Sequence, residues 1–285
     1  MSTDVFSPSN LEELASFLPR LEPGAVIVGG CTDVSVRFLN MPMPKQLVDL
    51  SSVSELKRIF IADGYLQIGA AVTCTELEGY ELPSGFAALK QAASDVGSKQ
   101  IRNAATIGGN LVNASPAGDV LLCLFLFEAV VEIMRPDGSI YELSIEEVVI
   151  GSGKTSLEYN EVLTAIKIPM TCIDNLCSAF LKLGYRKKVT IARINIAITL
   201  KTMNGKIDDL RFYMGAIAPV PIRVQEAEKI LLENEWNEQT SEKLYAYLSE
   251  MIKQTVPIEY DRDYKIHAVK GAVFDILSML QVAQT

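Results

Sequence analysis

The sequence has few of the side chains that metal centres and nucleophilic catalysis require. Its 285 residues include one histidine, His267, and five cysteines, at positions 31, 74, 123, 172 and 177, without a C-x-x-C pair. A structural zinc site, an iron–sulfur cluster and a Ser-His-Asp triad are therefore not expected on this chain. The favoured interpretation of the cysteines is free, buried and reduced thiols.

The sequence also lacks an excess of positive charge and a long apolar run. Its 26 Lys and Arg stand against 35 Asp and Glu, and the net charge of −9 disfavours nucleic acid or an anionic membrane as partner. The longest apolar run, Val120 to Phe127, is far shorter than the ~20 residues of a membrane span. No basic segment followed by an apolar one is visible at the start, so no secretion signal is expected. We expect a cytoplasmic protein without a membrane span.

Short helical and extended patterns alternate up to about residue 170. Ser9 and Glu12 have capping-box spacing, which predicts a helix over 9–18. Asp63-Gly64 and Pro136-Asp137-Gly138 predict two β-hairpins, with strands at 58–61, 65–69, 129–135 and 139–144. Further strands are expected at 25–28, 46–50 and 161–169, and further helices over 86–96, ending near Gly97, and over 120–127, with Asp119 as its cap.

The pattern changes after Pro169. Strands are expected at 179–185, 193–203 and 209–214, the last two joined by a hairpin turn at Asn204-Gly205. Three helical stretches follow, near 223–234, 240–253 and 264–280. An antiparallel sheet followed by helices predicts a separate C-terminal α+β domain, with its boundary at about 170–178.

A loop rich in small residues lies between apolar segments in the middle of the chain. It runs from Thr106 to Asp119, T-I-G-G-N-L-V-N-A-S-P-A-G-D, and is too rich in turn formers for the interior of a helix or strand. Glycine lets the main chain approach a ligand closely, and unpaired amide groups can form a nest for an anion. The alternative is an ordinary connecting loop.

Two further glycine segments invite a phosphate-binding interpretation. Gly29-Gly30-Cys31-Thr32-Asp33 follows a short strand, an arrangement that binds phosphate or ribose in many folds, but it lacks the G-x-G-x-x-G spacing. Gly151 to Thr155, G-S-G-K-T, resembles the end of a P-loop. The full motif needs a glycine where Val148 stands, so a P-loop is disfavoured.

Taken together, the two glycine loops carry a family resemblance. V-I-V-G-G-C-T-D at 26–33 and Q-I-R-N-A-A-T-I-G-G-N-L-V-N-A-S-P-A-G-D at 100–119 resemble the FAD-binding (medium) subunit of the molybdenum hydroxylases. This family includes the flavin domain of xanthine dehydrogenase and the medium subunit of carbon monoxide dehydrogenase. The later segments G-Y-R-K and I-A-R also fit, so the resemblance covers nearly the whole chain.

The resemblance implies an α+β fold in which FAD is held between two domains. The FAD-binding domain, of PCMH type, would span 1–172 and consist of two small α/β subdomains, about 1–55 and 56–172. A C-terminal domain, 178–285, would combine an antiparallel sheet with a helical bundle.

The resemblance also implies a set of cofactor-binding residues. The first loop would wrap the diphosphate and ribityl region, and Thr106 to Asn110 would supply amides and side chains to it. Asp119 would bind cofactor hydroxyl groups, Leu163 would lie at the flavin or adenine, and the charge of Lys182 would favour the anionic reduced flavin. The family motif is commonly A-G-G-T-D, so the inserted Cys31 leaves the register of the two preceding glycines open by one residue. The complete set is Ile27, Val28, Gly29, Gly30, Cys31, Thr32, Asp33, Val34, Gly97, Thr106, Ile107, Gly108, Gly109, Asn110, Asp119, Lys154, Leu163 and Lys182, with a solvated loop lysine as the alternative for Lys154.

The implied function is electron transfer without a catalytic side chain on this chain. In the family, a partner subunit with a molybdenum cofactor hydroxylates the substrate, and a second partner with [2Fe–2S] clusters relays the electrons. The flavin then passes them to NAD⁺ or another acceptor. Two alternatives stay open: a free-standing FAD oxidoreductase, and a non-catalytic assembly module of the same complex.

Overall fold

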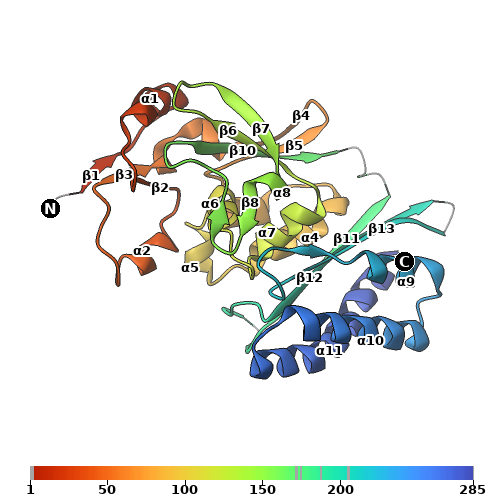
Figure 1. Cartoon of the computed structure of the whole chain (residues 1–285). Coiled ribbons are helices and arrows are strands. Elements are labelled where there is room, and N and C mark those ends of the chain that lie inside the picture. The colour runs from red at the N-terminus through yellow and green to blue at the C-terminus, as the bar shows by residue number, and fades with distance from the viewer. Residues whose placement is uncertain (1–2, 171–172, 174, 187, 204–205, 285) are drawn as a thin grey trace. The chain divides into compact units, whose positions relative to one another are not determined.

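The computed structural model describes residues 3–170, 173, 175–186, 188–203 and 206–284 (Figure 1). The chain divides into two compact units that are both discontinuous in sequence. Unit 1 comprises Met1–Tyr80, Ser98–Ala114 and Glu128–Met170, and unit 2 comprises Glu81–Gly97, Ser115–Phe127 and Thr171–Thr285. The domain division into 1–172 and 178–285 stays a prediction, because unit 2 also takes two segments from before residue 128.

Unit 1 begins with a small parallel sheet. Its strands are β1 (Asp4–Phe6), β2 (Val26–Val28) and β3 (Gln46–Asp49), in the order β1-β3-β2, with Ile27 opposite Val48. Leu14, Leu18 and Val48 are fully buried in a common core. The helical segments around this sheet are α1 (Leu11–Phe17), η1 (Leu18–Arg20), α2 (Val34–Arg37), η2 (Leu50–Ser52) and η3 (Ser54–Lys57).

Helix α1 begins one residue later than its predicted capping box. Asn10 is the N-cap, and its side chain accepts a hydrogen bond from the amide of Glu13 at 2.9 Å. The carboxylate of Glu13 accepts from the amide of Ser9 at 2.8 Å. The predicted box of Ser9 with Glu12 is therefore wrong by one position, because Asn10 is an equally good cap.

The larger sheet of unit 1 is antiparallel throughout. Both predicted hairpins are confirmed, and Asp63 and Gly64 have φ angles of 54° and 77°, the left-handed conformation that a tight hairpin turn needs. The strand order is β4 (Ile59–Ala62), β5 (Tyr65–Gly69), β10 (Val162–Pro169), β6 (Val130–Met134) and β7 (Ile140–Ser144). The remaining elements of unit 1 are α3 (Cys74–Gly79), α5 (Lys99–Arg102), α6 (Ile107–Val112), α8 (Ile145–Val148) and the hairpin of β8 (Val149–Gly151) and β9 (Lys154–Thr155).

Unit 2 is built on an antiparallel sheet with helices on both of its faces. Its strands are β11 (Leu176–Leu183), β12 (Ile194–Met203), β13 (Lys206–Gly215) and β14 (Ile222–Arg223), in chain order. The predicted strands and helices are confirmed, whereas the turn at Asn204-Gly205 lies outside the described residues. The helices are η4 (Ser84–Phe86), α4 (Ala87–Ser94), α7 (Asp119–Leu126), α9 (Gln225–Glu233), α10 (Glu238–Thr255) and α11 (Glu259–Gln284).

Strand alternation decides which helices each side chain of β12 meets. Ile194, Ile196 and Ile198 belong to one apolar core with residues of α9, α10 and α11. Successive side chains of a strand point to opposite faces. Asn195 accordingly points the other way, where it contacts α7. The sheet therefore presents a polar side chain to a helix whose eight residues are all buried.

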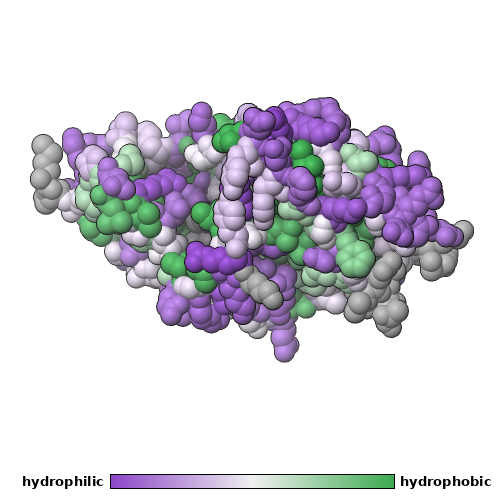
Figure 2. Space-filling model, turned by 90° about the horizontal axis from the view of Figure 1, so that it is seen from below, coloured by the Kyte–Doolittle hydropathy of each residue, from purple (hydrophilic) through white to green (hydrophobic). Residues whose placement is uncertain are grey.

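The α+β fold class that the sequence predicts is confirmed. Among the helices of the described ranges, none combines the length and apolarity needed to cross a membrane. Figure 2 shows one face of the molecule, on which hydrophilic side chains predominate and apolar ones form smaller patches between them.

Candidate functional site

The two glycine loops meet within unit 1. A Cβ atom on Gly30 would lie 1.6 Å from the carbonyl oxygen of Ala104, and one on Gly29 would lie 2.7 Å from Oγ1 of Thr106. Only residues without a side chain allow the main chain after β2 to lie this close to the segment before α6. The two segments that the resemblance assigns to the same part of the cofactor therefore lie against each other.

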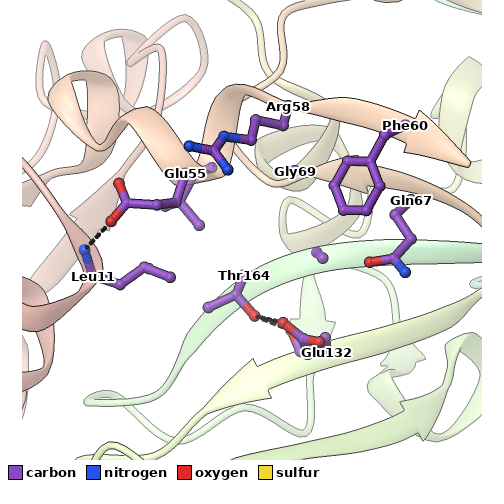
Figure 3. A pocket seen from close by; sticks show the side chains of 10 residues that line it. Leu11, Glu55, Arg58, Phe60, Gln67, Gly69, Glu132 and Thr164 are labelled. Carbon is purple, nitrogen blue, oxygen red and sulfur yellow. Dashed lines mark hydrogen bonds between the residues drawn. The ribbon is translucent and has the colours of Figure 1, made fainter. Parts of the chain in front are cut away.

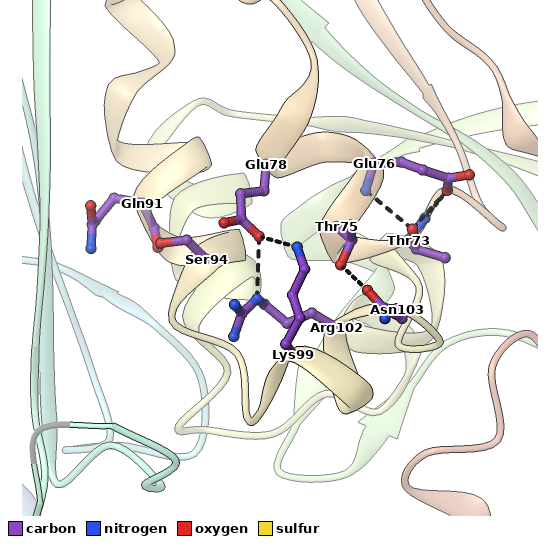
Figure 4. Close-up of polar contacts among 9 residues, drawn as sticks. All are labelled: Thr73, Thr75, Glu76, Glu78, Gln91, Ser94, Lys99, Arg102 and Asn103. Atoms are coloured by element: carbon purple, nitrogen blue, oxygen red, sulfur yellow. Dashed lines mark hydrogen bonds and ion pairs between the residues drawn. The ribbon is translucent and has the colours of Figure 1, made fainter.

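Helix α3 holds the segment that leads into the second loop (Figure 4). The carboxylate of Glu78 pairs with Lys99 and with Arg102, each at 3.3 Å. The hydroxyl of Thr75 donates to the side-chain oxygen of Asn103 at 2.8 Å. Residues 98–103 are thus fixed to α3 before the chain reaches the second loop.

The second loop contains a short helix that the sequence did not predict. Thr106 caps α6 by accepting from the amide of Gly109 at 3.0 Å. The amide of Ile107 donates to the carbonyl of Val72 at 2.8 Å, and that of Gly108 to the carbonyl of Ala70 at 3.0 Å. The predicted loop with unpaired amides is therefore wrong for 107–110, because the cap and the neighbouring strand end use these donors.

The free main-chain donors lie in the first loop instead. Within the part of the chain that the structure describes, the amides of Gly30, Cys31 and Thr32 donate to no acceptor. Cys31 has a φ of 55°, and a succession of such amides can form a nest for an anion. Gly109 is exposed, and a Cβ on it would approach only Thr106. This cradle, formed by residues 29–32 and Gly109, fits a diphosphate that needs neutral hydrogen-bond donors and close access to the main chain.

Arg37 links the two loops from the outside. Its guanidinium pairs with Asp33 at 2.9 Å and donates to the side-chain oxygen of Asn113, the C-cap of α6. Sequence reasoning missed this residue. The i, i+4 spacing of Asp33 and Arg37 indicates the ion pair, but nothing local indicates Asn113.

A buried ion pair forms the polar centre of unit 2. Asp119 and Lys182 are joined at 2.5 Å, and their side chains are 6% and 9% exposed. The amide nitrogen of Asn195 donates to the other oxygen of Asp119 at 3.2 Å. Lys182 donates further to the carbonyl of Asp95 at 3.0 Å. The structure thus brings two predicted site residues together and adds Asn195, which the sequence did not single out.

The role of Asp119 differs from the predicted one. Gly118 is the N-cap of α7, and no side chain caps this helix, so the predicted cap by Asp119 is wrong. Burial raises the pKa of the Asp119 carboxyl to about 6, against the opposing effects of the charge and hydrogen bond of Lys182 and the hydrogen bond of Asn195. The carboxyl group is therefore occupied by tertiary contacts rather than by its own helix.

Three other predicted positions belong neither to the cradle of unit 1 nor to the ion pair of unit 2. Leu163 is 4% exposed and lies at a β-bulge of β10 in unit 1. Lys154 lies on the β8–β9 hairpin and is exposed, and this hairpin excludes the P-loop alternative because no helix follows the glycines. Gly97 lies in unit 2, three residues after the end of α4, with a φ of 46°.

The cysteines follow the expectation only in part. Cys74 and Cys123 are buried free thiols as expected, but Cys31 is exposed and Cys177 is half-buried. Cys31 is exposed because it lies in the first glycine loop. Cys172 lies outside the described residues. No group of three or more His, Cys, Asp or Glu within the described ranges is arranged to hold a metal ion.

Unit 1 also contains a pocket of about 120 Å³ whose lining residues are not those of the cradle (Figure 3). Its polar groups are largely satisfied by one another: Glu55 accepts from the amide of Leu11 at 3.1 Å, and Thr164 donates to the carboxylate of Glu132 at 2.7 Å. None of its lining residues belongs to a glycine loop. It is therefore not part of the candidate site.

Comparisons with known proteins cover most of the chain. Residues 1–171 match the family described as FAD binding domain in molybdopterin dehydrogenase, and residues 179–280 match the CO dehydrogenase flavoprotein C-terminal domain. The sequence is 31% identical over 259 residues to the xanthine dehydrogenase FAD-binding subunit of Escherichia coli O157:H7, covering 90% of this chain and 88% of that protein. It is 30% identical over 290 residues to the nicotinate dehydrogenase FAD-subunit of Eubacterium barkeri, covering 98% and 97%. A chain of the reconstituted CO dehydrogenase from Oligotropha carboxidovorans superimposes with a TM-score of 0.83 at 25% identity, covering 97% of this chain and 98% of that one.

Proposed function

The chain belongs to the family of FAD-binding subunits of the molybdenum hydroxylases, which are oxidoreductases, and from this premise we propose that it is the electron-transfer subunit of such a complex. It accepts electrons from a partner subunit with [2Fe–2S] clusters and passes them to NAD⁺ or another acceptor. A further partner with the molybdenum cofactor oxidises the substrate. Residues 1–172 form the FAD-binding domain of this proposal, 178–285 its C-terminal domain, and the cytoplasm is its location.

The residues proposed to hold FAD supply neutral donors in unit 1 and charge in unit 2. The free amides of residues 30–32 and the open main chain at Gly109 suit the diphosphate. Asp119 offers a carboxylate for hydroxyl groups, and Lys182 offers positive charge to the flavin. Bound FAD supplies the ability to take up and release an electron pair, while the protein positions it and tunes its electronics. Ile27, Val28, Asp33, Val34, Gly97, Thr106, Ile107, Gly108, Asn110, Lys154 and Leu163 complete the proposed set.

The observation that carries the proposal is the contact between the two glycine loops, at Gly30 and Ala104. The direct test is the FAD content of the purified protein, measured by absorbance and by release of FAD on denaturation. We expect about one FAD per chain. A colourless protein that also fails to bind added FAD contradicts the proposal.

Gly109→Val tests where on the chain the cofactor is held. The added side chain enters the open face of the cradle and its Cβ lies 2.8 Å from Oγ1 of Thr106, so we expect FAD to be lost while the apo-protein stays folded with a somewhat lower thermal midpoint. Gly79→Val is the matched control, because Gly79 is also an exposed helical glycine of unit 1 and a Cβ on it meets nothing within 4 Å. Unchanged FAD content in Gly109→Val means that the second loop is only structural.

The partner subunits are tested by isolating the native complex. We expect a tagged chain from its own cells to retain a subunit with iron–sulfur clusters and one with molybdenum, detectable by metal analysis. A chain that is isolated with FAD but alone, and that reduces an acceptor by itself, favours the free-standing oxidoreductase. A chain that binds both partners but no FAD favours the assembly module.

A further inference from the structure

Asn195 is a polar residue near the start of the largely apolar strand β12. It is 1% exposed, and its neighbours Ile194 and Ile196 are buried in the core under the C-terminal helices. Its amide nitrogen donates to the carboxylate of Asp119 at 3.2 Å, across 76 positions of sequence. A buried amide is stabilising only where its hydrogen bonds are made. The contact with Asp119 therefore stabilises the buried amide of Asn195.

The side-chain oxygen of Asn195 accepts no hydrogen bond from the described residues. This oxygen is buried. Such an unsatisfied group destabilises a fold by about 1–3 kcal/mol. The bond from the nitrogen to Asp119 is thus the side-chain contact that orients this amide.

Gly215 makes the orientation of this amide possible. It lies opposite Asn195 in the β12–β13 ladder. A Cβ on Gly215 would lie 2.3 Å from the side-chain oxygen of Asn195 and 3.2 Å from the carbonyl of Pro116. Any larger residue would displace the amide from its place beside Asp119. Asn195 thus donates to the carboxylate of Asp119, and Gly215 on the neighbouring strand leaves the space that this orientation of the amide needs.

The titratable groups around Asp119 come from three elements. Lys182 of β11 is bonded to one carboxylate oxygen, Asp95 lies at the end of α4, and Cys123 lies on α7 itself. Asn195 of β12 provides a neutral donor to the Asp119 carboxylate. The hydrogen bond favours the ionised carboxylate. Its loss would leave Asp119 more protonated near neutral pH, and the charge of Lys182 would then be less compensated.

We infer that Asn195, supported by Gly215, is a positioning residue that keeps Asp119 ionised and directed at Lys182, and thereby sets the net positive charge that Lys182 presents to FAD. This inference rests on the proposed function, in which FAD lies beside Lys182. It assigns Asn195 no contact with the cofactor. It predicts that an uncharged residue controls the reduction potential of FAD through a second charge.

The first test is independent of FAD. The titration of Asp119 is followed in the apo-protein by ¹³C NMR of labelled aspartate carboxyl groups, with Asp119→Asn identifying the signal. We expect Asn195→Ala and Gly215→Ala to move the titration midpoint to higher pH. Thr199→Val is the control, because Thr199 is a buried polar residue of the same strand. An unchanged midpoint in folded Asn195→Ala, or an equal shift in Thr199→Val, overturns the inference.

The second test measures the reduction potential of FAD in the full-length protein between pH 5 and 8. We expect Asn195→Ala to shift the potential to a more positive value near pH 7, and Lys182→Met to shift it to a more negative one. Asn195→Asp keeps the shape but places a second carboxyl beside Asp119, which donates when protonated and adds a negative charge when ionised, so its potential should depend more steeply on pH. This variant and Gly215→Ala decide the matter if Asn195→Ala does not fold.

The outcomes separate the inference from the proposed function. A shifted potential in Lys182→Met, with wild-type potentials in the Asn195 and Gly215 variants, overturns the inference and leaves the flavoprotein function intact. A wild-type protein that binds no FAD overturns the proposed function itself.

Discussion

The cradle of unit 1 and the ion pair of unit 2 deal with charge in opposite ways. The cradle offers free main-chain amides at 30–32 and an exposed glycine, and no buried charge is part of it. The polar centre of unit 2 buries a full carboxylate and a full ammonium group, both more than nine-tenths removed from solvent. Each arrangement is consistent with its surroundings, because neutral amides tolerate exposure and charges tolerate burial only when they are paired.

The cradle and the ion pair therefore tolerate different kinds of substitution. In the cradle, what matters is the absence of side-chain atoms, so the damaging changes are additions. In the ion pair, what matters is the presence of both partners, so the damaging changes are deletions. Four predictions follow from this contrast, beginning with the largest expected effect.

Removing one partner of the ion pair should have the largest effect. Asp119→Ala leaves the ammonium group of Lys182 buried without its counter-ion, and we expect a loss of about 3–5 kcal/mol in the free energy of unfolding. The double variant Asp119→Leu with Lys182→Met removes both charges and should recover most of this loss. Urea denaturation measures both. Equal stability of the single and double variants would show that the pair does not act as a unit.

The ion pair should also make stability depend on pH. The pKa of Asp119 is raised to about 6 in the folded protein, above its usual value of about 3.9. The folded state therefore binds more protons between these values, so the stabilisation from Asp119 is present below pH 4 and is lost as the pH rises to 6. We expect the wild type to lose up to roughly 3 kcal/mol relative to Asp119→Asn across this range. Parallel unfolding profiles of the two proteins from pH 4 to 7 would contradict this.

An addition to the cradle should have a smaller effect on stability but a complete effect on FAD. Gly30→Ala places a Cβ against the carbonyl of Ala104, so the two loops must separate. We expect a loss of about 1–3 kcal/mol and no retained FAD, measured by thermal unfolding and flavin absorbance. Gly79→Ala is the control, and it should keep both properties. A Gly30→Ala protein with full FAD content would show that loop contact is not required.

The smallest effect is expected at the exposed link between the loops. Arg37→Met removes the contacts with Asp33 and Asn113, and because the side chain is half exposed we expect less than about 1 kcal/mol of destabilisation. FAD should nevertheless dissociate faster, because the two glycine loops lose the contact that Arg37 makes between Asp33 and Asn113. Lys253→Met, which removes a similarly exposed ion pair of α10, is the control for stability. If FAD dissociates at the same rate from Arg37→Met and from the wild type, the contacts of Arg37 do not contribute to FAD binding.

The sequence predicted elements well where the determining pattern is local. The hairpin at Asp63-Gly64 is one example, since both residues adopt the left-handed angles that this dipeptide favours. The strand 161–169 is another, because its apolar run agrees with β10. The errors lie where two local choices are nearly equal, as between Ser9 and Asn10 at the start of α1. They also lie where a tertiary contact overrides the local composition. In α6, hydrogen bonds to Ala70 and Val72 accompany a helix where the composition predicts a loop.

For the candidate site, the sequence located the two glycine loops and, through family resemblance, Asp119 and Lys182. It did not show that the amides of 107–110 are occupied, because their acceptors are carbonyl groups of Ala70 and Val72 at the end of another strand. It also gave no indication of Asn195, which has the sequence environment of a core strand.

The set of helices and strands and the two glycine loops follow from local sequence patterns, because turn formers and apolar periodicity act over a few residues. Only the tertiary structure decided which donors stay free and which charges are paired. Asp119 meets Lys182 and Asn195 across 63 and 76 positions. Such contacts depend on which face of each strand meets which helix, and that is settled only when the sheet and its helices pack together.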